Sequence, residues 1–247
     1  MTSPEWDAAT YDRIADPMHR WGLAVLERLD LAGDERVLDA GCGSGRVTEA
    51  LLERLPDGHV IALDASNAML EEARRRLARF GDRVTFVQAD LGRPLPIEDP
   101  VDAILSTATF HWVPDHAALF RNLAAIIRPG GRLVAQCGGC GNIASLDRIL
   151  AAMGISGRGA LNFARPLETV AKLEAAGFRD PEVWLTDEPT RLEDGEPLES
   201  YLATVCLREL IARLDPGDRK AFVHEVAARM PEPILDYVRL NIGATRR

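Results

Sequence analysis

Cysteine is scarce in this sequence, which has four in 247 residues, at positions 42, 137, 140 and 206. Small secreted domains held together by disulfides carry a much higher density of cysteine, so the composition excludes that class. Cys137 and Cys140 have the CxxC spacing of some metal and redox sites, but neither a second such pair nor a histidine pair lies near them in the sequence. We therefore interpret the pair as part of a Gly-rich turn after a strand and predict no bound metal.

Long apolar runs and clusters of unbalanced positive charge are also missing. No stretch approaches the roughly 20 apolar residues of a membrane-spanning helix, and residues 2–6 lack the basic and apolar segments of a secretory signal. The net charge is −9, and the densest arginine cluster, within residues 74–79, directly follows Glu71 and Glu72, as is typical of a solvated helix face. A negative surface repels phosphate backbones. These features predict a cytoplasmic protein with neither a membrane nor a nucleic-acid partner.

Hydrophobic residues make up 47% of the chain, the ordinary share for a folded protein, and 247 residues are enough for one α/β domain. Short apolar runs bounded by turn residues alternate with helical stretches, which is the pattern of a parallel sheet covered by helices. The expected strands are Arg36–Ala40, His59–Asp64, Val84–Ala89, Val101–Ser106 and Arg132–Cys137. The expected helices are Arg46–Arg54, Asn67–Phe80, Asp115–Ile127 and Ile143–Met153.

The pattern changes after residue 154, where several glycines mark a loop. The elements expected beyond it are the helix Leu167–Ala176, the strand Glu182–Thr186, the helices Leu198–Leu214 and Arg219–Arg229, and a last strand-like run from Ile234 to Ile242. An amphipathic helix is expected upstream, at Met18–Leu29. We predict a single domain over residues 1–247, with a cofactor-binding core at 35–140 and helical lid elements over the substrate at 1–30 and 154–232. We expect it to be a monomer or a homodimer.

The most informative segment is VLDAGCGSGRVTEAL, residues 37–51, in which a predicted strand leads through a glycine-rich loop into a predicted helix. Glycine at Gly41, Gly43 and Gly45 lets the chain turn sharply and brings bare backbone amides close to a ligand, where any Cβ would collide. Dinucleotide sites typically read G-x-G-x-x-G, whereas here Asp39 is followed by glycine at every second position. The loop therefore favours a nucleotide-type ligand other than a dinucleotide.

Acidic or hydroxyl side chains close the strands that follow. Asp64 ends the second strand about 20 residues after the loop, where this type of fold presents a carboxylate to ribose hydroxyls. Asp90 follows the third strand, and Ser106 and Thr107 end the fourth. An Asp that closes a strand is often only a helix N-cap or a turn former. At these intervals, however, Asp39, Asp64 and Asp90 together with the loop favour a site for an adenosyl ligand.

The pattern from Asp39 to Gly45 resembles the D/E-x-G-x-G-x-G motif of the class I S-adenosylmethionine-dependent methyltransferases, and the resemblance covers about residues 35–140. The segments FHWVPDH at 110–116 and RPGGRLVAQ at 128–136, with the Tyr11-Asp12 stretch, are similar to the trans-aconitate and juvenile-hormone-acid methyltransferases, which methylate carboxylates. The resemblance implies a Rossmann-like, doubly wound α/β fold. It also implies a seven-stranded, mostly parallel sheet whose last strand is antiparallel, and a helical lid.

The resemblance also implies roles for single residues. Asp39 lies near the methionine amino group, Asp64 holds the ribose, and Met69 packs against adenine. Asp90 meets the adenine amine, and Tyr11 and Arg20 close over the cofactor, with Arg20 facing its carboxylate. The implied cofactor is S-adenosyl-L-methionine, and the product is S-adenosyl-L-homocysteine. The residues expected to contact it are Tyr11, Arg20, Asp39, Gly41, Cys42, Gly43, Gly45, Asp64, Ala65, Met69, Ala89, Asp90, Leu91, Ser106 and Thr107.

The partner that accepts the methyl group is expected to be a small molecule. A carboxylate is already ionised near neutral pH and needs no general base, so His111 and Trp112 would then shape the pocket, with Arg158 or Arg165 as an anion clamp. A hydroxyl acceptor makes a base useful, and His111 is the best candidate for it. N-methylation of an amine remains an alternative, as does a non-catalytic module that binds this cofactor or another nucleotide. The missing x-x-G spacing argues against an NAD-dependent oxidoreductase.

Overall fold

The computed structural model describes residues 16–157 and 160–247, which contain one seven-stranded sheet with the strand order β3-β2-β1-β4-β5-β9-β6. Strands β1 to β5 pair in parallel, whereas β9 runs antiparallel to both of its neighbours, β5 and β6. The strands are β1 (Arg36–Ala40), β2 (His59–Asp64), β3 (Val84–Gln88), β4 (Val101–Thr107), β5 (Ile127–Gly138), β6 (Phe178–Asp187) and β9 (Val238–Arg246). This confirms the predicted sheet, including its antiparallel last strand.

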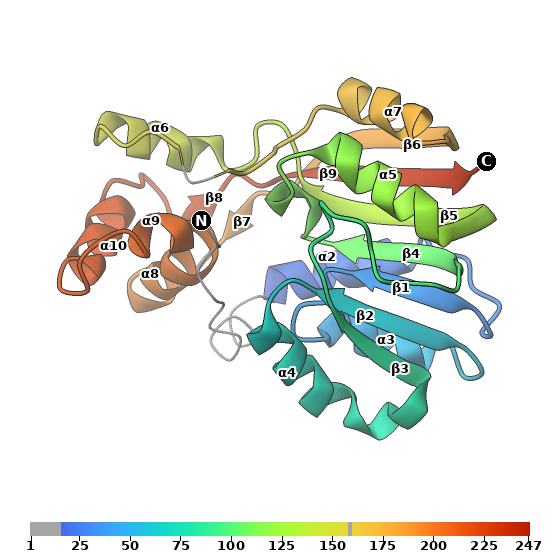
Figure 1. The fold of residues 1–247 in the computed structure, drawn as a ribbon. Helices are drawn as coiled ribbons and strands as arrows, with labels where there is room; N and C mark the ends of the chain where they lie inside the picture. The colour runs from blue at the N-terminus through green and yellow to red at the C-terminus, as the bar shows by residue number, and fades with distance from the viewer. Residues whose placement is uncertain (1–15, 158–159) are drawn as a thin grey trace.

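Helices cover both faces of the sheet (Figure 1). The helices are α2 (Asp16–Leu26), α3 (Arg46–Glu53), α4 (Asn67–Leu77), α5 (His116–Ile126), α6 (Ala144–Ala152), α7 (Pro166–Ala175), α8 (Glu196–Tyr201), α9 (Arg208–Ile211) and α10 (Arg219–Ala228), with short 3-10 turns η1 (Ala78–Arg83) and η2 (Phe110–Trp112). No helix among the residues described is both long and apolar enough to cross a bilayer.

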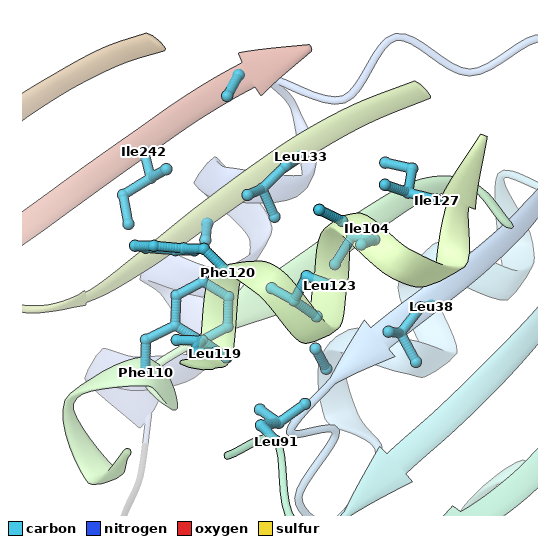
Figure 2. Close-up of a cluster of buried hydrophobic side chains, with 14 of the residues drawn as sticks. Leu38, Leu91, Ile104, Phe110, Leu119, Phe120, Leu123, Ile127, Leu133 and Ile242 are labelled. Atoms are coloured by element: carbon cyan, nitrogen blue, oxygen red, sulfur yellow. The ribbon is translucent and has the colours of Figure 1, made fainter. Parts of the chain in front are cut away.

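The central strands are buried on both faces because two separate hydrophobic clusters flank them. Successive residues of β1 point to opposite sides, so Val37 packs under α2, α3 and α4 while Leu38 packs under α5 and α7. Figure 2 shows the second of these clusters, in which Phe120 of α5 lies between Phe110 and Ile242 of β9. The two clusters fix the sheet and therefore the positions of its carboxyl ends.

A third hydrophobic cluster joins α6, α8, α9 and α10, which gather beyond one end of the sheet (Figure 1). We call these four helices, with the segment η3 (Leu202–Cys206) between α8 and α9, the lid. Trp21 of α2 is buried in the same cluster, as is Tyr237 just before β9. A two-stranded ribbon, β7 (Thr190–Arg191) with β8 (Ile234–Leu235), connects the lid to the sheet.

Several predicted boundaries are wrong. The expected helix Leu198–Leu214 is interrupted by η3, a π-helical segment, after which Leu207 leaves helical geometry. The helix expected to reach Phe80 ends at Leu77 and continues as the 3-10 turn η1, which is kinked at Gly81. The last run, expected from Ile234 to Ile242, is split into β8 and β9, and β9 extends to Arg246 because it pairs on both sides. Strands β5 and β6 are likewise longer than predicted.

Candidate active site

The glycine-rich loop lies between the end of β1 and the start of α3. Gly41, Gly43 and Gly45 all have positive φ, at 86°, 54° and 83°, a region that favours glycine. A Cβ on Gly41 would overlap the side chain of Thr109, so the loop is packed tightly on that side. A Cβ on Gly43, by contrast, would meet nothing within 4 Å. Gly43 therefore faces open space at the carboxyl edge of the sheet.

Asp39 is the penultimate residue of β1, just before this loop, and is 1% exposed. Its Oδ2 accepts a hydrogen bond of 2.6 Å from the Thr48 hydroxyl of α3. Burial raises the pKa of Asp39 to about 7, the negative charge of Asp64 adds to this, and the Thr48 hydrogen bond opposes it. A buried carboxylate of this kind is stabilised by a cation placed next to it.

Asp64 ends β2 and meets the loop from the neighbouring strand. Its Oδ2 accepts a hydrogen bond of 2.9 Å from the Gly43 amide, and its Oδ1 accepts one of 2.9 Å from the Ser66 amide. Ser66 in turn caps α4, because its hydroxyl accepts from the amide of the buried Met69. The carbonyl of Ala65 accepts from a glutamine side chain of β3. Residues that are far apart in the sequence are thus brought together at one edge of the sheet, as predicted.

The ends of β3 and β4 complete this edge. The Ala89 amide donates to the carbonyl of Asp64 at 3.1 Å. The side chain of Asp90 is 60% exposed, and Leu91 beside it is buried. Ser106 is buried and donates to the carbonyl of Ala40 at 2.6 Å, so its hydroxyl ties β4 to β1. Thr107, the last residue of β4, is half-buried.

Of four further predicted residues, the structure describes two, Cys42 and Arg20. Cys42 is buried in the loop, and burial raises the pKa of its thiol well above the ordinary value. Arg20 lies on α2 and is exposed. Tyr11 lies outside the described residues, as does Arg158. The part of the chain that is described holds no cluster of three side chains able to ligate a metal.

A cavity lies between the lid and the carboxyl ends of β4 and β5. The sheet side supplies His111 and Trp112 of η2 and Arg239 of β9, and η3 supplies Val205 and Cys206. The remaining walls are largely apolar or aromatic, and none of the described residues that line the cavity is acidic. The cavity is therefore a candidate site for a small-molecule substrate.

The His111 ring is held in a defined orientation. Its Nδ1 accepts a hydrogen bond of 3.2 Å from the Gly138 amide at the end of β5, and its face stacks on Phe163 at 5.9 Å between ring centroids. Because a backbone N–H donates to Nδ1, the proton of the neutral ring resides on Nε2. His111 is then a hydrogen-bond donor, and its basic nitrogen is already engaged by the main chain.

Arg239 was missed as a site residue by the sequence analysis, which proposed Arg158 or Arg165 as the cation. Arg239 is 2% exposed, its Nε donates to Gln136 Oε1 at 3.3 Å, and its guanidinium lies over the Trp21 ring at 4.7 Å. The side chain of Arg165 is 70% exposed, and its Nε lies 4.0 Å from Glu168 Oε1. Arg165 does not line the cavity. The available signal was an arginine inside the strand-like run expected from Ile234 to Ile242, since a buried arginine is rare without a partner.

Comparison with known proteins identifies the family. A model of a methyltransferase domain matches residues 37–131. A trans-aconitate 2-methyltransferase of Methylobacterium radiotolerans is 33% identical over 231 residues, which cover 89% of this chain and 86% of that protein. Another, from Streptomyces coelicolor, is 33% identical over 243 residues, covering 92% and 79%. The chain belongs to the class I S-adenosylmethionine-dependent methyltransferases. This confirms the predicted family, enzyme class and cofactor.

This methyltransferase is also similar to a further sequence relative and to solved structures of other methyltransferases. A trans-aconitate 2-methyltransferase of Methylobacterium nodulans is 43% identical, but over 132 residues that cover 53% of this chain and 49% of that protein. A phosphoethanolamine N-methyltransferase of Haemonchus contortus has a TM-score of 0.66 at 17% identity, over 97% of this chain and 56% of that one. Geranyl diphosphate methyltransferase has a TM-score of 0.58 at 21% identity, over 93% and 85%. At such identities the structural likeness establishes the fold alone.

Proposed function

We propose that this methyltransferase transfers a methyl group to a carboxylate oxygen of a small organic acid. The observation that carries the proposal is Arg239, a buried cation in the wall of a cavity whose described lining contains no acidic residue. A buried guanidinium stabilises an anion strongly and can bind a carboxylate through two parallel hydrogen bonds. The names of the relatives, trans-aconitate 2-methyltransferases, agree with an acidic acceptor.

The glycine loop fits S-adenosylmethionine. Gly43 leaves open the space that a Cβ would fill, and the acids Asp39 and Asp64 flank it. In this proposal Asp39 holds the cofactor's amino group, Asp64 its ribose, and Met69 with Asp90 its adenine. The loop residues, Ala65, Ala89, Leu91, Thr107 and the α2 residue Arg20 would complete the cradle. Ser106 would contribute indirectly, because its hydroxyl is bonded to Ala40.

When bound, S-adenosylmethionine would supply a methyl group on a cationic sulfur, and the acceptor's carboxylate oxygen would take this methyl group while the electron pair of the broken S–CH3 bond stayed on sulfur. No proton has to move when the acceptor is a carboxylate, so the residues of the cavity need only position it and exclude water. Arg239 provides the charge, His111 donates from Nε2, and Trp112 shapes the wall. A hydroxyl acceptor gains no support, because the Gly138 amide occupies the nitrogen of His111 that could take a proton.

The test is an assay with labelled S-adenosylmethionine and a panel of trans-aconitate, decanoate and cinnamate, each beside its amide and a related alcohol and amine. We expect a labelled methyl ester from at least one acid. Arg239→Gln should lower kcat/KM for that acid by about 100-fold, the value of a buried charge-assisted hydrogen bond. The matched control, Arg165→Gln, should stay within two-fold. Preferred methylation of an amine or alcohol would refute the proposal.

The role of His111 has its own test. We expect His111→Ala to lower turnover of the acid by a factor that is the same at pH 6.5 and pH 8.5, since the ring donates a hydrogen bond and removes no proton. The measurement is kcat at both pH values. A loss that alkaline pH partly rescues would instead identify His111 as a general base.

A further inference from the structure

A stripe of buried polar side chains crosses the sheet on the face covered by α2. Arg239, Asn241 and Thr245 of β9 point to this face at alternate positions, with Gly243 between the last two, and all three side chains are buried. The residues between them, Leu240, Ile242 and Ala244, belong to the apolar cluster on the other face. Gln136 of β5 lies opposite Asn241 in the antiparallel register and is buried as well. Burying so many polar groups is costly unless each is hydrogen-bonded.

The direction of every amide in this stripe is fixed by arginines at its two ends. Arg239 Nε can only donate, so Gln136 must present Oε1 to it, at 3.3 Å. The other end of the same amide, Nε2, then donates to Asn241 Oδ1 at 3.0 Å. Arg28 Nη1 also donates to Asn241 Oδ1, at 3.3 Å, and Asn241 Nδ2 donates to the Thr186 hydroxyl at 3.1 Å. The chain Arg239–Gln136–Asn241–Arg28 therefore has one consistent arrangement.

Arg28, which lies just after the end of α2, anchors the far end of this chain of hydrogen-bonded side chains. Its Nη2 donates to the carbonyl of Ile242 at 2.8 Å, and its guanidinium lies 4.7 Å from the ring centre of Trp184 on β6. Burial lowers the pKa of Arg28, the negative charge of Glu182 opposes this, and Arg132 adds to the lowering. Trp21, which packs on Arg239 at the other end, is a residue of α2 itself. Helix α2 and the turn that follows it thus contact both ends of this hydrogen-bonded chain.

We propose that Gln136 is a positioning residue which, with Asn241 and Arg28, fixes the guanidinium of Arg239 in the orientation that receives the acceptor's carboxylate. This inference rests on the proposed function. A guanidinium anchored through Nε and packed on an aromatic ring keeps one plane, and a fixed plane is what recognition of a planar carboxylate by two parallel hydrogen bonds requires. Orienting groups that lie behind a binding residue commonly set how well it works.

Two variants of Gln136 test the proposal. Gln136→Leu removes both hydrogen bonds from the chain, and Gln136→Glu places a carboxylate beside the Arg239 cation, where it competes with the substrate. The measurements are KM and kcat for the best acid of the panel, the inhibition constant of that acid's amide, and calorimetric binding of S-adenosylhomocysteine. We expect Gln136→Leu to raise KM about ten-fold and Gln136→Glu to raise it further. Binding of the neutral amide and of S-adenosylhomocysteine should change less than two-fold.

The matched control is Thr245→Val. Thr245 is buried on the same face of β9 and accepts a hydrogen bond of 3.0 Å from Arg132, but it lies at the far end of the strand. It should lower the melting temperature while leaving the ratio between acid and amide binding unchanged. If Gln136→Leu also leaves that ratio unchanged while Arg239→Gln abolishes it, the positioning role is refuted and the proposed function stands. If the wild type methylates no acid, both the proposed function and the positioning role of Gln136 are refuted.

Discussion

Asp39 is a residue whose ionisation opposes folding of the ligand-free chain. Burial raises its pKa from 3.8 to about 7, so the folded state favours the protonated form. The free energy of unfolding is therefore highest below pH 3.8, where Asp39 is protonated in both states, and it falls as the pH rises from 3.8 to 7. Asp39→Asn cannot ionise and keeps an acceptor for the Thr48 hydroxyl. Relative to the wild type, this variant should gain roughly 3 kcal/mol of unfolding free energy between pH 5 and pH 8, at ~1.4 kcal/mol per pH unit up to pH 7.

The same substitution should weaken cofactor binding. Urea unfolding at pH 5 and pH 8 measures the stability, and calorimetry with S-adenosylhomocysteine should show an affinity at least about ten-fold lower, because a buried charged hydrogen bond to the amino group is lost. Asp39 would then be retained for the ligand at the expense of stability. An equal stability difference at both pH values would contradict this account.

Substitutions at Gly41 and Gly43 should have different effects, because one position is packed against the protein and the other faces open space. Gly41→Ala would overlap Thr109 and should cost about 2–4 kcal/mol of unfolding free energy, from overpacking and the strain of positive φ. Gly43→Ala meets no neighbour and should cost about 1 kcal/mol from strain alone. Its Cβ occupies the proposed cofactor space, so S-adenosylhomocysteine should bind at least ten-fold more weakly. Unchanged binding by a stable Gly43→Ala variant would place the cofactor elsewhere.

At the scale of elements, η3 gives the cavity part of its shape. The Leu207 amide donates to the Leu202 carbonyl, five residues back, at 2.8 Å, so one extra residue is accommodated in this turn. Deleting Thr204 should restore regular α-helix and move Val205 and Cys206, which line the cavity. We expect KM for the acid to change more than five-fold, with helix content by circular dichroism and S-adenosylhomocysteine affinity nearly unchanged. An unchanged KM across the whole acid panel would show that η3 does not shape the acceptor site.

The sequence predicted the central elements better than the peripheral ones. The bounds of β1 and β2 are as predicted, because short apolar runs there end at turn residues and both faces are buried. The break within Leu198–Leu214 was not predictable, because a π turn leaves the apolar pattern of a helix almost intact. Similarly, Asp39 and Asp64 could be placed at one edge from strand order alone. The positions of Arg239 and Gln136 depend on the register of β9 between β5 and β6, which local patterns do not specify.

For the whole molecule, the separation of three hydrophobic clusters predicts different effects of equivalent core mutations. Leu202 lies in the lid cluster and Leu38 in the sheet, and both are fully buried. Each leucine to alanine change should cost about 2–5 kcal/mol. Leu202→Ala should impair acid turnover while S-adenosylhomocysteine binding stays within two-fold, whereas Leu38→Ala should weaken both. Turnover and calorimetry at 15 °C measure the two effects. An equal loss of acid turnover and of S-adenosylhomocysteine binding in Leu202→Ala would show that the lid and the sheet do not act separately.

The position of β9 also has a consequence for synthesis on the ribosome. This strand follows every other described strand in the chain, yet it inserts between β5 and β6 and carries Arg239. Until it emerges, the nascent chain can form the glycine loop and the first five strands, but β5 has an unpaired edge. The ability to bind the methyl donor would therefore precede the ability to recognise an acid, because β9 supplies both the missing strand and the cation proposed to bind the substrate.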